Sequence, residues 1–119
     1  DAFARAPPPL RAVIAPSILS ADFARLGAES MRMLDEGADS LHLDLMDGHF
    51  VDNLTIGPPV VAAVRRHVGE RAVLDCHCMV SEPLKWVRAL ADAGATAMTF
   101  HAEAVADDEL AAACRTVRA

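Results

Sequence analysis

The amino-acid sequence predicts an α/β fold: a partial TIM-type (β/α)8 barrel, with about the first four βα units in this chain. Short β-like runs alternate with amphipathic helical runs, which is typical of a parallel sheet built from right-handed βαβ units. Gly37 and Gly94 follow helical runs, where helices commonly end. The segment PSILSADF, after the first β-like run, lacks the glycines of a nucleotide-binding loop, which disfavours a flavodoxin-like or Rossmann sheet.

The first βα unit follows an N-terminal segment, residues 1–11, that is expected to be a flexible arm. Its triple proline opposes both helix and central strand. The first strand is expected over residues 12–19, and Ser20 or Asp22 is expected to cap the helix that follows. The apolar face of this helix is expected to contain Phe23, Leu26 and Leu34.

The second unit is expected to contain a strand over residues 40–46, a loop, and a helix with Pro58 and Pro59 in its first turn. The inward-facing residues of that helix are expected to be Val60, Val61, Val64 and Val68.

The third and fourth units follow the same pattern. Strands are expected over residues 72–79 and 97–102, and Ser81 is expected to cap a helix with Pro83 in its first turn. A last helix is expected to begin near Asp107. Its charge order, which suits the helix dipole, comes from Asp108 and Glu109 in the first turn and Arg115 and Arg118 in the last. A closed barrel has eight units and about 250 residues, so residues 12–119 are expected to form its N-terminal half.

Composition excludes several classes of function. The net charge of -6 argues against binding to nucleic acid through a basic face. No apolar run approaches the roughly 20 residues that a membrane helix requires. An odd number of cysteines indicates reduced thiols, and a cytoplasmic location is expected. The spacing of Cys76-His77-Cys78 is wrong for a paired zinc-binding motif, which disfavours a zinc knuckle.

Candidate functional residues emerge from the alternation of side chains along residues 40–46. Three leucines point one way, while His42, Asp44 and Met46 point the other way. Burying a histidine and an aspartate is costly unless they are paired or bind a metal ion. We therefore expect His42 and Asp44 to serve a catalytic or metal-binding function rather than to pack in the core.

The neighbouring strands send further polar side chains toward the same interior. Residues 72–79 present Asp75, His77 and Met79 on one face, and the fourth strand presents Thr99, His101 and Glu103. Polar residues near the carboxyl ends of barrel strands are the expected catalytic positions. For His101 we expect a hydrogen-bonded position beside the site.

The pattern favours a metal-assisted acid–base site. His42, Asp44 and His77 offer two imidazoles and a carboxylate, which suit zinc, iron, manganese or cobalt. A carboxylate in such a site can take a proton from a carbon next to a carbonyl group. Schiff-base chemistry is disfavoured because the single lysine, Lys85, falls in a helix, and a serine hydrolase is disfavoured because no GxSxG motif occurs.

Several long segments resemble successive motifs of the ribulose-phosphate 3-epimerase family. They are, in order, PSILSADF, LHLDLMDGHFV, NLTIGPPVV, CHCMVSEP and FHAEA. The resemblance implies a (β/α)8 barrel that interconverts D-ribulose 5-phosphate and D-xylulose 5-phosphate in the pentose phosphate pathway. It implies that the reaction moves a proton at C3 and passes through an enediolate.

The resemblance also implies roles for individual residues. His42, Asp44 and His77 match ligands of one divalent metal ion, and Asp44 matches one of two catalytic acid–base aspartates. The matching substrate-binding residues are Ser17, His42, His77, Met46 and Met79. The two methionines match residues that crowd the enediolate, and ordinary core packing is the alternative for them.

The family's second catalytic aspartate and its phosphate-binding loops have no counterpart in these residues. We therefore expect the chain alone to be inactive, and the whole protein to be a homo-oligomer with a sugar-phosphate substrate and no membrane or nucleic-acid partner. Two alternatives remain open: a non-catalytic half barrel that dimerises through its sheet edges, and a related hexulose-phosphate 3-epimerase.

Overall fold

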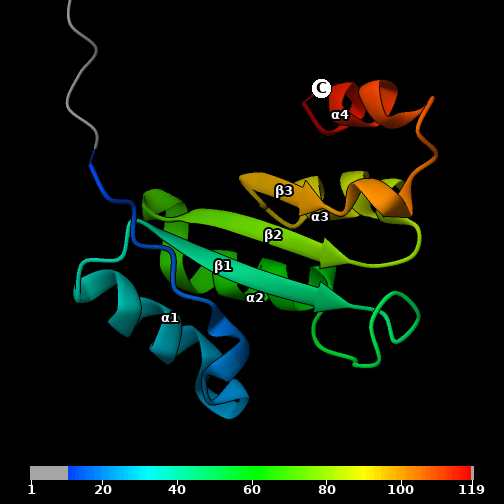
Figure 1. The fold of residues 1–119 in the computed structure, drawn as a ribbon. Helices are drawn as coiled ribbons and strands as arrows, with labels where there is room; N and C mark the ends of the chain where they lie inside the picture. The colour runs from blue at the N-terminus through cyan, green and yellow to red at the C-terminus, as the bar shows by residue number, and fades with distance from the viewer. Residues whose placement is uncertain (1–10, 119) are drawn as a thin grey trace, which may run out of the picture.

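The computed structural model describes residues 11–118 and confirms the alternation of strands and helices (Figure 1). Of the predicted arm, residues 1–10 lie outside the described residues. The strands and α-helices, in chain order, are α1 (Leu26–Asp35), β1 (Ser40–Met46), α2 (Pro58–Val68), β2 (Val73–Met79), α3 (Val87–Asp92), β3 (Ala97–Phe100) and α4 (Leu110–Arg118). None of these helices is long and apolar enough to cross a membrane.

The three strands form one parallel sheet in the order β1-β2-β3. Helices connect them, and α2 and α3 lie behind the sheet in Figure 1. This order, with helices between sequential parallel neighbours, agrees with part of a βα barrel.

The prediction of a strand over residues 12–19 is wrong. The chain there runs beside β1, and the carbonyl oxygens of Ile14 and Pro16 accept hydrogen bonds from Asp39 N and His42 N, both at 2.9 Å. Only a single bridge, Ser17 to His42, is formed. Pro16 has no N–H to donate, and the chain turns into a 3₁₀ helix directly after Ser17, so the ladder ends early.

The start of the first helix differs from the prediction. Asp22 does act as a cap, because its Oδ1 accepts a hydrogen bond from Ala24 N at 3.0 Å. It caps a 3₁₀ turn, Phe23–Arg25, that precedes α1, while Ser20 belongs to an earlier 3₁₀ turn. Phe23 was therefore wrongly assigned to the apolar face, and its side chain is exposed.

Ser81 was also wrongly predicted to cap a helix. The chain after β2 enters a 3₁₀ helix, Pro83–Trp86, whose N-cap residue is Glu82. Ser81 instead donates hydrogen bonds from its backbone N and its Oγ to Asp47 Oδ2, each at 2.9 Å.

The last helix begins later than predicted, at Leu110. Asp108 and Glu109 therefore precede the helix rather than occupying its first turn. Arg115 and Arg118 do lie in the last turn, as predicted.

A single apolar core fills the space between the sheet and the helices. The leucines of β1 are buried, as predicted from their alternation, and three residues of β2 are buried on the same side of the sheet. Residues in this core include Leu41, Leu43, Leu45, Leu74, Cys76, Cys78, Val61, Val64, Val68 and Leu90. Val60, which was predicted to face inward, is only partly buried.

Arg65 of α2 joins the amino ends of two strands. Its guanidinium donates to the carbonyl oxygens of Gly69, Ala72 and Gly94 and to Thr96 Oγ1, at 2.7 to 2.9 Å. Gly94 has a φ of 89°, and a Cβ there would lie 2.7 Å from Arg65 Cγ. Glycine at the predicted end of α3 is therefore required by backbone conformation and by space.

Truncation of a core leucine tests the packing. Leu43 is fully buried in β1, so Leu43→Ala is expected to lower the free energy of unfolding by about 2–5 kcal/mol. Leu54 is 76% exposed, and the matched control Leu54→Ala is expected to change it by less than about 0.5 kcal/mol. Urea unfolding followed by circular dichroism measures both, and equal losses would contradict the assignment of the core face.

Candidate metal and acid–base site

Asp44 lies at the centre of the polar face of the sheet. Its side chain is only 10% exposed, and Ser17 donates its hydroxyl hydrogen to Asp44 Oδ2. The other carboxylate oxygen, Oδ1, lies 3.0 Å from His77 Nδ1 and 3.3 Å from His42 Nε2. The carboxylate is therefore contacted by one hydroxyl, which donates to it, and by two imidazole nitrogens.

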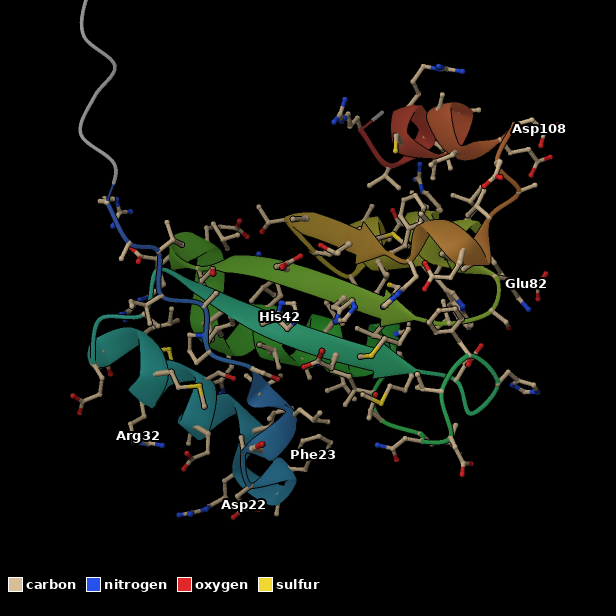
Figure 2. All side chains as sticks on the ribbon, viewed as in Figure 1. Asp22, Phe23, Arg32, His42, Glu82 and Asp108 are labelled. Atoms are coloured by element: carbon tan, nitrogen blue, oxygen red, sulfur yellow. The ribbon has the colours of Figure 1, made fainter. Side chains whose placement is uncertain are left out.

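Strand register brings these residues together. Side chains alternate along β1 and β2, so residues on the polar face of one strand lie beside those of the next strand. His42 is visible on this face, on the side of the sheet opposite α2 (Figure 2). The facing pairs are His42 with Asp75, Asp44 with His77, and Met46 with Met79.

The donor atoms of His42, Asp44 and His77 fit a divalent metal ion. One ligand atom from each residue lies within 4.8 Å of the others. Two imidazole nitrogens and a carboxylate oxygen form a donor set suited to zinc, iron, manganese or cobalt. The sequence predicted this grouping, and the structure brings the three residues together.

Asp75 was not predicted as a functional residue, although its face was predicted. Its Oδ2 lies 3.0 Å from His42 Nδ1, on the opposite side of the imidazole from Asp44. Thr99 of β3 donates its hydroxyl hydrogen to Asp75 Oδ1 at 3.2 Å. Asp75 is therefore held between a histidine of β1 and a threonine of β3.

His101 continues the polar network beyond His77. The Nε2 atoms of the two rings lie 3.0 Å apart, so one ring donates to the other. His101 Nδ1 lies 3.3 Å from Glu103 Oε1, and the Phe50 ring lies against His101 with centroids 4.8 Å apart. The predicted position of His101 as a hydrogen-bonded neighbour of the site is confirmed.

Met46 and Met79 end their strands side by side and are partly buried. They lie on the polar face, one step beyond Asp44 and His77 toward the carboxyl ends. The structure brings the two methionines together, while their contact with substrate stays a prediction.

Asp47 fastens two loops at the carboxyl end of the sheet. Its carboxylate accepts hydrogen bonds from the backbone N–H groups of Ser81, Phe50 and His49 and from Ser81 Oγ, at 2.9 to 3.0 Å. The backbone bond from Ser81, followed by those from Phe50 and His49, holds the pKa of Asp47 well below its usual range. Sequence reasoning missed this residue because its main partner is distant along the chain.

The cysteines of β2 take no part in the site. Cys76 and Cys78 are fully buried in the core, on the opposite face from His77. Burial raises the pKa of each thiol to about 12, so neither is a ready thiolate ligand. This geometry argues against a zinc knuckle at Cys76-His77-Cys78. Lys85, the lysine considered for Schiff-base chemistry, is exposed and pairs with Glu82 at 3.7 Å.

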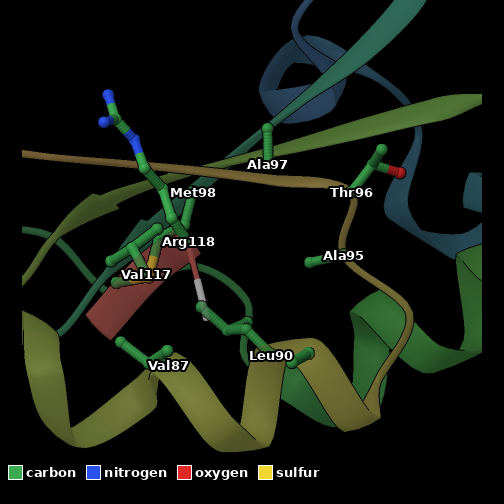
Figure 3. A pocket seen from close by; sticks show the side chains of 9 residues that line it. Val87, Leu90, Ala95, Thr96, Ala97, Met98, Val117 and Arg118 are labelled. Carbon is green, nitrogen blue, oxygen red and sulfur yellow. The ribbon is translucent and has the colours of Figure 1, made fainter. Parts of the chain in front are cut away.

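A separate apolar cavity of about 440 Å³ lies on the other side of β3, between α3 and the end of α4 (Figure 3). Its lining includes Val87, Leu90, Met98 and Val117. Among the described residues that line it, Arg118 is the one that is charged, and none of them has a carboxylate or imidazole side chain. The chemistry-bearing side chains therefore gather on the polar face of the sheet, away from this cavity.

Comparison with known proteins gives a single family. A family model described as "Ribulose-phosphate 3 epimerase family" matches residues 13–118. This family has the TIM-barrel fold, and a parallel three-stranded sheet is consistent with part of such a barrel.

Individual relatives agree with the family match. The chain is 57% identical over 97 residues to "Ribulose-phosphate 3-epimerase, cytoplasmic isoform" of Oryza sativa subsp. japonica. The aligned region covers 82% of this chain and 42% of the relative. It is 54% identical to "Ribulose-phosphate 3-epimerase" of Schizosaccharomyces pombe, covering 84% of the chain and 44% of the relative. The corresponding Mycobacterium bovis protein is 50% identical, covering 90% and 44%. The chain thus spans less than half the length of these relatives.

The lowered pKa of Asp47 predicts how stability depends on pH. A carboxyl whose pKa is lower in the folded state stabilises that state above its unfolded pKa, and this contribution is lost as the pH falls from about 5 downward. Asp47→Asn lacks the contribution, so its free energy of unfolding is expected to fall less steeply on acidification than that of the wild type.

Urea unfolding at a series of pH values measures this difference. Asp92→Asn is the matched control, because Asp92 is exposed and pairs only with Arg88 among the described residues. Parallel pH curves for the wild type and Asp47→Asn would contradict the role given to the Asp47 hydrogen bonds.

Proposed function

The chain belongs to the ribulose-phosphate 3-epimerase family, and we propose that the whole protein interconverts D-ribulose 5-phosphate and D-xylulose 5-phosphate. The observation that carries this proposal is the Asp44 carboxylate, held between two imidazoles on a shielded face at residues that match the family's motifs. In this proposal the protein is a cytoplasmic isomerase, like the rice relative, which is named as a cytoplasmic isoform.

Asp44 is the proposed acid–base residue of this chain. Its side chain lies on the polar face of β1, and the Ser17 hydroxyl donates a hydrogen bond that orients Oδ2. In the proposed reaction Asp44 takes the proton from C3 of the sugar, leaving an enediolate, and an acid on the opposite face returns a proton to C3. The reverse reaction exchanges the two roles.

His42, Asp44 and His77 are the proposed ligands of one divalent metal ion, either zinc, iron, manganese or cobalt. When bound, the ion supplies positive charge that stabilises the substrate oxygens as negative charge develops. The histidines orient these oxygens, so that C3 lies within reach of Asp44.

Ser17, Met46 and Met79 complete the proposed substrate contacts of this chain. The Ser17 hydroxyl lies beside Asp44, where it can also meet a substrate oxygen. The two methionines, at the adjoining ends of β1 and β2, exclude water from the enediolate. Exclusion of water keeps the reactive intermediate from collecting protons at the wrong carbon.

The chain alone supplies one side of a two-sided reaction. Among residues 11–118, Asp75 is the other carboxylate nearest to the site, and it is engaged by His42 and Thr99. We therefore propose that the isolated chain is inactive, and that the whole protein works as a homo-oligomer with the second acid supplied from outside these residues. Turnover of the isolated chain near that of its full-length relatives would contradict this proposal.

Removal of the acid–base group tests the proposed role of Asp44. In the whole protein, Asp44→Asn is expected to lower kcat about 10²–10⁴-fold, because the amide cannot take a proton from C3. Conversion of D-ribulose 5-phosphate and wash-in of deuterium at C3 are followed together by NMR. Asp92→Asn, at an exposed position on α3, is the control and is expected to keep full activity. Undiminished deuterium wash-in by Asp44→Asn would reject the assignment.

Metal removal tests the other half of the proposal. Dialysis against a strong chelator is expected to abolish turnover, and addition of zinc, manganese, cobalt or iron(II) is expected to restore it. His77→Ala is expected to weaken metal binding while leaving the fold intact by circular dichroism. Full activity in metal-free protein, confirmed by elemental analysis, would overturn the proposed cofactor.

A further inference from the structure

We propose that a second layer of side chains positions the two imidazoles of the site. In this layer, Asp75 forms a hydrogen bond with His42. On the other side, His101 forms a hydrogen bond with His77 and is itself bonded to Glu103. The inference rests on the proposed metal site. It deepens that proposal by assigning positioning roles to three residues that do not themselves reach the metal or the substrate.

The first part of this layer is the contact between Asp75 and His42. His42 Nε2 faces Asp44 at 3.3 Å, while His42 Nδ1 faces Asp75 Oδ2 at 3.0 Å. A proton on Nδ1, donated to Asp75, leaves the lone pair of Nε2 directed toward Asp44 and the metal position. Asp75 thereby selects both the tautomer and the orientation of the ring.

Asp75 is itself held in place, which a positioning residue requires. Thr99 of β3 donates to its second oxygen at 3.2 Å. The carboxylate of Asp75, on the central strand β2, therefore contacts one residue on each neighbouring strand. Its side chain is 27% exposed, which limits competition from water for the bond to His42. A fixed acceptor loses less conformational entropy when the imidazole binds to it.

The second part of the layer uses the opposite nitrogen of its histidine. His77 Nδ1 faces Asp44 at 3.0 Å, and His77 Nε2 faces His101 Nε2 at 3.0 Å. With a proton on His77 Nε2, His101 Nε2 is the acceptor, and the proton of His101 Nδ1 goes to Glu103 at 3.3 Å. This order of donors leaves His77 Nδ1 free to bind metal.

Glu103 and Phe50 support His101 from two sides. A hydrogen bond from the backbone of Glu103 itself, followed by the hydrogen bond from His101, lowers the pKa of Glu103, so this carboxylate stays ionised as an acceptor. The Phe50 ring packs against His101 at a centroid distance of 4.8 Å. Because Asp47 holds the backbone of Phe50, the loop after β1 also bears on the orientation of His77.

Ordinary strand pairing is the competing explanation. His42 and Asp75 are direct register partners, and such neighbours touch in any parallel sheet. Strand pairing alone predicts no effect on metal binding, whereas a positioning layer predicts weaker binding when an acceptor is removed. Metal affinity and ring tautomer, rather than stability, therefore distinguish the two explanations.

The test uses the whole protein and zinc as the probe. Zinc affinity is measured by competition with a chromophoric chelator for Asp75→Ala, Asp75→Asn, His101→Phe and His101→Gln. Asp75→Ala and His101→Phe are each expected to bind zinc about 10–100-fold more weakly, because each removes an acceptor. Asp75→Asn and His101→Gln, which retain an acceptor oxygen, are expected to recover most of the affinity.

Two controls and one spectroscopic measurement complete the design. Asp92→Asn and His67→Gln change an exposed carboxylate and an exposed histidine away from the site, and both are expected to bind zinc like the wild type. Nitrogen-15 NMR of the metal-free wild type is expected to show a protonated Nδ1 on His42 and a protonated Nε2 on His77. In Asp75→Ala the His42 signal is expected to lose this single tautomer.

The outcomes separate this inference from the proposed function. If the wild type binds zinc and all four variants bind it equally well, the positioning layer is rejected and the metal site stands. If the wild type binds no zinc, both the proposed metal site and the positioning layer are rejected. Should Asp75→Ala not fold, Thr99→Val decides, because it removes the donor that fixes Asp75: unchanged zinc affinity and an unchanged His42 tautomer would reject the Asp75 role.

Discussion

The in-register parallel pairing of β1, β2 and β3 is the constraint on which the rest of this structure depends. One face of the sheet is committed to the helices, since Leu43 of β1 and Cys76 of β2 are fully buried there. Alternation then leaves Asp44 and His77 no position except the opposite face, where register makes them neighbours. A slip of one residue would exchange the faces, burying the carboxylate among the leucines.

A polar face on a sheet of this kind is costly to maintain. Asp44 is largely removed from water, and an unpaired buried carboxylate would destabilise the fold by several kcal/mol. The hydrogen bond from Ser17 offsets part of this cost, and a metal ion held together with His42 and His77 would offset the rest. Apolar residues on this face would allow the same strand pairing without the free-energy cost of burying a charge. The charged residues are therefore better explained by a chemical function than by packing.

The sequence predicted those features that depend on local periodicity. Residues 40–46 form the expected strand, and the burial of their leucines follows from alternation alone. Features that depend on distant partners were mispredicted or missed. Ser81 resembles a helix cap, but its hydroxyl and N–H are taken by Asp47, 34 residues earlier. Asp75 carries no local signature, because its role arises only when β1 and β3 flank it.

The two ends of the sheet divide stability from function. At the amino end, Arg65 donates hydrogen bonds to the carbonyl oxygens of Ala72 and Gly94, and its hydrogen-bond partners among residues 11–118 are not residues of the candidate site. At the carboxyl end, Asp47 fixes the loops whose residues border His101. Barrel enzymes commonly separate these tasks in this way. Changes at Arg65 should therefore act through the folded population, whereas changes at Asp47 should also alter the geometry around the histidines.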